Sequence, residues 1–161
     1  MQLNEGLQKL GSGAFEMSAI DRIMFPKSLK RLEDETFKSC RNLKNVEIPS
    51  HIEYIGKGCF EDSAIERIQL SPALKQIEDR TFYRCWDLKR VDIPDGVEYI
   101  GEECFCYSAV EEVALPCTLV KIGKNAFKDC SKLRVVWVED GCKIKVKWHV
   151  GRGVEVRWRE R

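Results

Sequence analysis

Hydrophobic residues recur along this chain in a frame of 22 or 23 residues. Phenylalanine marks the frame at positions 15, 37, 60, 82, 105 and 127, with steps of 22 and 23 residues in turn. One unit runs from Leu29 to Pro49 and reads LKRLEDETFKSCRNLKNVEIP. A fixed period of about 20 to 29 residues is the signature of a solenoid. The pattern therefore predicts six stacked coils.

The end of each unit predicts one short strand. In residues 43–48, Val46 and Ile48 alternate with polar residues, as in a half-buried strand. The proline that follows cannot donate to a strand ladder, so it ends the strand. Successive coils should stack these strands into a parallel sheet with a spacing of about 4.8 Å.

The segment around each phenylalanine, such as residues 78–85, is predicted to form a short helical turn on the outer side and to bury its ring. Two kinds of unit alternate, so the true period is 45 residues. A long unit carries a cysteine after the phenylalanine, and a short unit carries Ser-Ala and one residue fewer. One coil cannot bury its own apolar face, so contacts between coils should provide most of the stability.

These units resemble the BspA-like class of leucine-rich repeats. The shared motif, L-x-x-I-x-x-x-x-F-x-x-C-x-x-L-x-x-V-x-I-P, covers residues 1–138. Ser71-Pro72 displaces one proline, and Glu139 stands where a seventh would be expected. The resemblance implies a right-handed, horseshoe-like α/β solenoid with a concave sheet. It also implies a non-catalytic role in adhesin-like surface or secreted proteins of mucosal bacteria and protists, with host matrix or cell-surface proteins as partners.

The start of the chain looks incomplete. Leu3 aligns with Ile93 and Leu7 with Val97, so Met1 falls within the strand of a coil whose first half is missing. Terminal repeats normally need a polar cap, and none precedes Leu7. We therefore expect a longer array, or a first coil that packs on a partner, including end-to-end self-association.

Residues 139–161 are predicted to form a capping β-hairpin. Apolar and polar residues alternate in 144–150 and again in 154–158, and the Gly151–Gly153 segment supplies a turn. Such a hairpin would lay valine and tryptophan over the last coil. The alternative is a basic, aromatic patch that binds a polyanion. Its members would be Lys143, Lys145, Lys147, Arg152, Arg157 and Arg159.

The net charge of the chain excludes few classes of binding partner. Lysine and arginine total 27 against 26 aspartates and glutamates, so the chain as a whole does not attract nucleic acid or an anionic membrane. No stretch approaches the roughly 18 apolar residues of a membrane span, and the first residues lack the apolar region of a signal peptide. The compartment stays open: the resemblance points to the cell surface or secretion, whereas free thiols would allow an intracellular scaffold.

No pattern supports catalysis, a cofactor or a metal. The only histidines are His51 and His149, and the Cys104-x-Cys106 pair lacks a second pair with ligand spacing. Equivalent cysteines two coils apart should lie about 9–10 Å apart, beyond the limit of about 7 Å for a disulfide. Buried free thiols are therefore predicted at Cys40, Cys59, Cys85, Cys104 and Cys130. Cys106 and Cys117 are predicted to be exposed, and Cys142 occupies an apolar column.

Strand residues that point away from the core form the predicted binding face. One column alternates in the sign of its charge from coil to coil, which favours cross-strand ion pairs and a structural role. Its members are Asp21, Lys44, Glu66, Lys89, Glu111 and Arg134. Two further columns do not follow the 45-residue period. They contain arginines and a tryptophan, which are common hot-spot residues at interfaces. The predicted binding residues are Arg22, Asn45, Glu47, Arg67, Gln69, Arg90, Asp92, Glu112 and Trp137.

The sequence thus predicts a non-catalytic protein-binding module that uses its concave face. Three alternatives stay open. The chain could be a structural spacer or an intracellular scaffold whose ligand site lies elsewhere in a longer chain, or it could bind a polyanion through its basic end. Trp137 could also pack on the terminal hairpin instead of a ligand.

Overall fold

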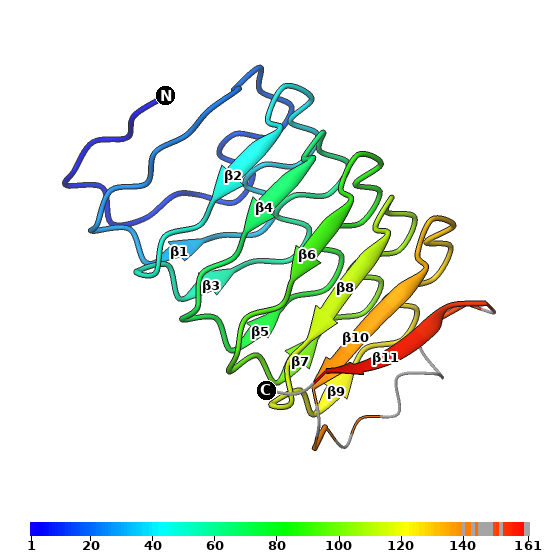
Figure 1. The fold of residues 1–161 in the computed structure, drawn as a ribbon. Helices are drawn as coiled ribbons and strands as arrows, with labels where there is room; N and C mark the ends of the chain where they lie inside the picture. The colour runs from blue at the N-terminus through cyan, green and yellow to red at the C-terminus, as the bar shows by residue number, and fades with distance from the viewer. Residues whose placement is uncertain (140, 143, 145–149, 152, 160–161) are drawn as a thin grey trace.

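The strands of the computed structural model lie in parallel, one coil beside the next (Figure 1). The structure describes residues 1–139, 141–142, 144, 150–151 and 153–159. The main sheet has the order β11-β10-β8-β6-β4-β2. Its strands are β2 (Asn45–Glu47), β4 (Arg67–Gln69), β6 (Arg90–Asp92), β8 (Glu112–Leu115), β10 (Val135–Glu139) and β11 (Glu155–Arg159). The predicted parallel solenoid is confirmed.

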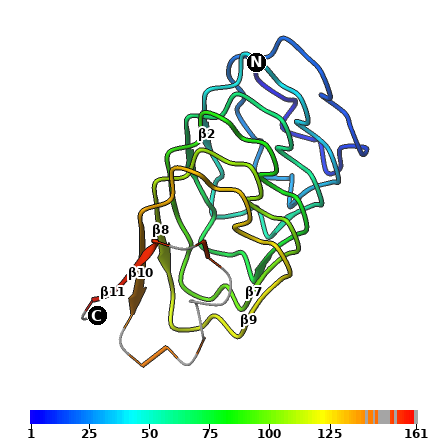
Figure 2. The same ribbon diagram turned by 90° about the vertical axis from the view of Figure 1, so that its right-hand side faces the viewer.

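Each coil after the first adds a second, shorter strand that the hydrophobic pattern did not predict. These strands form a pair, β1-β3, and a three-stranded sheet, β5-β7-β9. They are β1 (Arg31–Leu32), β3 (Tyr54–Ile55), β5 (Gln76–Ile77), β7 (Tyr99–Ile100) and β9 (Lys121–Ile122). Figure 2, seen from the side, shows the coils as successive loops around the core that these sheets enclose.

The phenylalanine side chains form a continuous stack in that core. Phe37, Phe60, Phe82 and Phe105 are fully buried. From Phe15 to Phe127, neighbouring ring centroids lie 5.2–5.8 Å apart with near-parallel planes. One ring per coil therefore joins all six coils into a single hydrophobic column.

The outer segments are pairs of tight turns, not the helical turns that the sequence suggested. None of the described residues is helical. The residues two before and two after each ring have positive φ, for example Glu35 and Ser39, both at 57°. A right-handed helix requires negative φ at every residue. In these turns the amides of Glu35, Phe37 and Ser39 all donate to carbonyls of the next coil at 2.8 Å, so bonds between coils replace bonds within a helix.

Serine and cysteine alternate at one buried position of the outer turn, which explains the 45-residue period. The Cys85 thiol donates to the carbonyl of Phe60 in the preceding coil (3.1 Å) and contacts the Ser63 hydroxyl (3.7 Å). Cys40 and Cys130 make the equivalent contacts with Ser18 and Ser108. Each long coil therefore packs its cysteine on the serine of the short coil before it.

All eight cysteines are free thiols, and the five predicted to be buried are buried. The prediction for Cys106 was wrong, since only 2% of this residue is exposed. Other coils carry longer side chains such as lysine, glutamate or tyrosine at this position. The Cys106 side chain is shorter and is buried instead; burial raises its pKa, and the negative charges of Glu103 and Asp129 add to this effect. Cys117 is half-buried, and Cys142 is buried at the C-terminal end.

Thiol labelling should therefore single out one cysteine. Burial raises the pKa of Cys85 to about 12 and that of Cys130 to about 11, and a protonated, shielded thiol is unreactive. At pH 8 a brief exposure of the native protein to iodoacetamide should modify Cys117 first, and urea should expose all eight cysteines. Peptide mass spectrometry measures both. Equally fast modification of Cys85 and Cys117 would contradict the packing between coils.

The first residues of the chain lie on the same side of the solenoid as the main sheet and pair like a strand, as the alignment predicted. Gln2 forms a parallel bridge with Met24, and the Met24 amide donates to the Met1 carbonyl at 2.9 Å. Leu3 and Leu10 are buried against the second coil, whereas Leu7 is half-buried.

The end of the chain differs from the expected cap. β11 pairs in parallel with β10, from Val135↔Glu155 to Glu139↔Arg159, so it extends the main sheet instead of lying over the last coil. Parallel pairing covers the polar edge of β10, which would otherwise be open, while Val156 packs against the core. The first arm of the expected hairpin, 143–150, lies mostly outside the described residues. The division between 1–138 and 139–161 stays a prediction.

Candidate binding site

Parallel register converts the sequence columns into rows of side chains across the main sheet. Asn45 lies beside Arg67 and Glu47 beside Gln69, while Val46 between them packs in the core. The arginine row consists of Arg22, Asn45, Arg67, Arg90, Glu112 and Val135. The mixed row consists of Met24, Glu47, Gln69, Asp92, Ala114 and Trp137.

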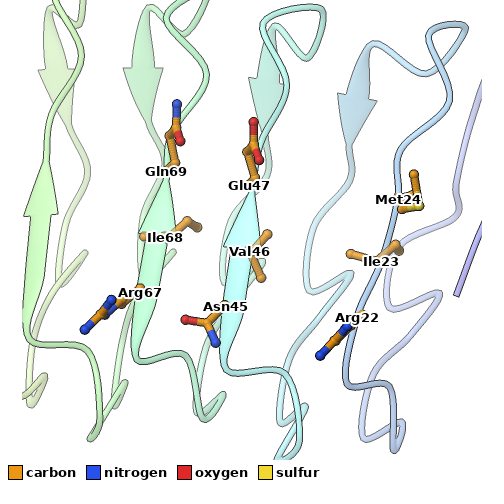
Figure 3. Close-up of a pocket in the computed structure, with 9 residues that line it drawn as sticks. All are labelled: Arg22, Ile23, Met24, Asn45, Val46, Glu47, Arg67, Ile68 and Gln69. Carbon is orange, nitrogen blue, oxygen red and sulfur yellow. The ribbon is translucent and has the colours of Figure 1, made fainter.

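A groove opens between these rows at the N-terminal end of the sheet. We name it the first groove, and Figure 3 shows Arg22, Asn45 and Arg67 along one edge and Met24, Glu47 and Gln69 along the other. Ile23, Val46 and Ile68 lie between the two edges. The structure thus brings together five of the nine predicted binding residues and adds Met24.

A second groove continues the first toward the C-terminal coils. It is lined by Glu66, Arg67, Ile68, Lys89, Arg90 and Asp92, so Arg67 belongs to both grooves. Lys89 and Glu66 belong to the column that alternates in sign, and the sequence did not predict them as binding residues. Lys89 differs from Lys44 and Arg134 of that column because it forms no ion pair with the described residues, which only the structure shows.

Some charges on this face already have partners. Arg90 donates to Asp92 at 3.1 and 3.2 Å, and Lys44 pairs with Glu66 at 2.9 Å. The Lys44 hydrogen bond lowers the pKa of the Glu66 carboxyl. No described residue forms an ion pair with Arg22, Arg67 or Lys89. Both grooves therefore contain cations that form no ion pair with the described residues, and the charges of Lys89 and Arg67 act on the Glu66 carboxyl only at longer range.

The alternating column has the structural role that the sequence suggested, at least in part. Besides Lys44 and Glu66, Arg134 pairs with Glu111 at 2.8 Å across neighbouring strands. These side chains are 36–71% exposed, so each pair contributes about 0–1 kcal/mol to stability.

On the C-terminal part of the face, the polar side chains bond to one another. The Trp137 indole donates to Glu112 at 3.3 Å, and the Arg157 guanidinium lies 5.4 Å from the Trp137 ring centroid. Arg157 also pairs with Glu155 at 2.8 Å. Glu112 and Trp137 therefore lie outside both grooves. The alternative expected for Trp137, packing on the terminal segment, agrees with this contact to β11.

The possible polyanion patch is described only in part. Lys143, Lys145, Lys147 and Arg152 lie outside the described residues. The two described members are engaged in ion pairs, Arg157 with Glu155 and Arg159 with Glu139. Within the described ranges there is no group of three or more metal-ligating side chains.

A parallel sheet built from one unit per coil and a stacked phenylalanine column define a leucine-rich-repeat solenoid. The chain belongs to the family described as the BspA type leucine rich repeat region, which matches six copies over residues 2–136. The resemblance drawn from the repeat motif is thereby confirmed.

Solved structures of bacterial leucine-rich-repeat proteins have the same fold. A leucine rich cell surface protein from Faecalibacterium prausnitzii is 27% identical, with a TM-score of 0.66, over 78% of this chain and 33% of that one. A leucine rich repeat protein from T. pallidum is 25% identical, with a TM-score of 0.68, over 83% of this chain and 64% of that one. A third, from Eubacterium ventriosum, has a TM-score of 0.72 at 20% identity and supports the fold alone.

This chain therefore spans less than two thirds of the length of the first structures that it resembles. A comparison with curated protein sequences found no match. The described part of the chain contains no helix long and apolar enough to cross a membrane.

Proposed function

We propose that this chain is a non-catalytic protein-binding module of an adhesin-like surface or secreted protein and that it binds through the main-sheet face. The supporting observation is the pair of open grooves whose cations Arg22, Arg67 and Lys89 form no ion pair with the described residues. The surface location rests on a relative that is named as a cell surface protein. Repeat solenoids commonly use such extended faces for binding.

Rigidity suits this face for recognition. The strands under it are held by ladders on the main sheet and by hydrogen bonds between the outer turns. Side chains in the rows are therefore presented at a fixed spacing of about 4.8 Å. Binding to a rigid face loses less conformational entropy than binding to a mobile loop, and arginine is a frequent hot-spot residue.

A charge-reversed variant tests the proposal. The purified chain serves as bait for extracts of extracellular matrix and cell surfaces, beside an Arg67→Glu plus Arg90→Glu variant. A specific partner should bind the variant at least tenfold more weakly, since two reversed charges at the site cost well over the roughly 1.4 kcal/mol of a tenfold change. Because both side chains are exposed, thermal unfolding should be nearly unchanged.

Lys30→Glu plus Lys75→Glu is the matched control. These exposed lysines lie next to β1 and β5, outside the main sheet, so this variant should bind like the parent. Equal binding by all three proteins would contradict the main-sheet site. Absence of any partner would favour the spacer or scaffold alternative.

Self-association through the first coil stays a prediction. Phe15, Ile20, Ile23 and Phe25 at this end are only partly buried. We expect a dimer that Leu7→Lys abolishes, because a charge on the half-buried Leu7 would be desolvated at such an interface. Sedimentation velocity over a range of concentrations measures this, and a monomer throughout would contradict it.

A further inference from the structure

β4 and β6 place two arginines side by side. Arg67 and Arg90 are the residues in register between these two strands, and parallel strands lie about 4.8 Å apart. Like charges directly opposite on neighbouring strands are destabilising. Asp92 balances Arg90, whereas no described carboxylate contacts Arg67. Arg67 therefore has no ion-pair partner among the described residues, and its charge acts on the Glu66 carboxyl only at longer range.

Lys89 adds a second cation to the same groove. Its neighbours in the alternating column are Glu66 and Glu111, but Glu66 pairs with Lys44 and Glu111 with Arg134. Lys89 thus forms no ion pair with the described residues and acts on the Glu66 carboxyl only at longer range, and it lines the second groove together with Arg67. An anionic group in this groove would contact two cations that form no ion pair with the described residues.

The first groove supplies uncharged hydrogen-bonding groups next to these cations. Asn45 and Gln69 are exposed, and no described residue bonds to either carboxamide. A carboxamide offers both a donor and an acceptor, as the main chain of an extended peptide requires. Glu47 lies between Met24 and Gln69 on the same edge, and it would repel a ligand with continuous negative charge.

From these observations we infer that the grooves bind an extended acidic peptide segment of a partner protein. One aspartate or glutamate of the segment contacts Arg67 and Lys89, and the Asn45 and Gln69 carboxamides bond to its main chain. A guanidinium binds a carboxylate through two parallel hydrogen bonds. The carboxylates Glu47, Asp92 and Glu66 in the grooves disfavour nucleic acid and sulfated glycan, whose charge is continuous. This inference rests on the proposed function and specifies its ligand.

The spacing of the arginines suggests a conformation for the segment. Arg22 and Arg67 are separated by two strand spacings, about 10 Å. A peptide in the polyproline II conformation repeats every third residue, about 9 Å along its axis. Acidic residues three positions apart can therefore contact Arg67 and Arg22 from the same side of the peptide.

A defined peptide tests the inference. The probe is a fluorescent nine-residue peptide of proline and serine with aspartates at its third and sixth positions, and its counterpart carries asparagine at both. Fluorescence polarisation should show binding of the aspartate peptide only. Arg67→Gln plus Lys89→Gln should weaken binding at least about tenfold, because charge-assisted hydrogen bonds are lost. Lys30→Gln plus Lys75→Gln is the matched control and should bind normally.

Other results would overturn the inference. These are no binding of the aspartate peptide, equal binding by the Arg67→Gln plus Lys89→Gln variant, or preferential binding of a sulfated oligosaccharide or a single-stranded oligonucleotide at these residues. If the extract yields a partner that the Arg67→Glu plus Arg90→Glu variant loses, while the aspartate peptide fails to bind, the proposed function stands and the inference fails. If neither binds, both fail.

Discussion

Replacing Phe82 with alanine is expected to lower the free energy of unfolding by about 3–5 kcal/mol, the usual cost of deleting a buried aromatic ring. Phe82 is fully buried and stacks on two rings, Phe60 at 5.8 Å and Phe105 at 5.2 Å. Its loss would open a cavity in the middle of the phenylalanine column. Since coils are stable mainly through their neighbours, the unfolding transition should also broaden as the two halves become less coupled.

Phe15→Ala is the matched control for this variant. Phe15 occupies the same position in the first coil, but it is only partly buried and stacks on one ring, Phe37, at 5.5 Å. Urea unfolding followed by circular dichroism should show a clearly smaller loss of stability. Equal losses in the two variants would mean that the column is not the source of stability in the interior coils.

Gly101→Ala is expected to cost about 3 kcal/mol, at the upper end of the range for overpacked cores. A Cβ at this position would lie 2.4 Å from the Asp79 amide nitrogen and 2.4 Å from the Glu78 carbonyl carbon of the preceding coil. Both atoms belong to the backbone, so no side chain can move aside and the two coils must separate. Differential scanning calorimetry should show a lower melting temperature.

The repeat provides an internal control for the glycine as well. Gly11 is the equivalent residue of the first coil, and a Cβ there would meet no atom within 4 Å. Gly11→Ala should therefore leave stability within about 1 kcal/mol of the parent, or raise it slightly by restricting the unfolded chain. A similar loss in both variants would exclude close approach of the coils as the reason for glycine at this position.

Much of the fold follows from local pattern. The 22/23-residue frame identified six coils, the alternation around Val46 identified the strand of the main sheet, and the recurrence of cysteines at 45 residues identified buried free thiols. These predictions succeeded because every coil repeats the same contacts. A residue of one coil contacts the equivalent residue of the next coil, so the repeat in the sequence also indicates which residues are neighbours in space.

The outer turns show where the same reasoning failed. A helical turn was expected around each phenylalanine, but the positions two residues before and after each ring have positive φ. Gly13, Gly58 and Asn125 fill the position before the ring in three coils and are the signal that the sequence offered. The other three coils carry Glu35, Arg80 and Glu103 there. Hydrogen bonds from each turn to the next coil hold these residues in the left-handed region. Local propensity cannot reveal bonds that form only when coils stack.

For the binding site too, one part could be predicted from the sequence and another could not. The sequence by itself determined the solenoid, its rows of outward side chains, and the two columns that break the 45-residue rhythm. Only the tertiary structure decided which charges on that face form ion pairs: Asp92 binds Arg90 and Glu66 binds Lys44, while Arg67 and Lys89 form no ion pair with the described residues. It also placed β11 beside β10, where Arg157 covers Trp137 and removes it from the open face. The reason is that a repeat specifies which residues are neighbours, whereas the pairing among several neighbouring charges depends on how their side chains extend across the assembled sheet.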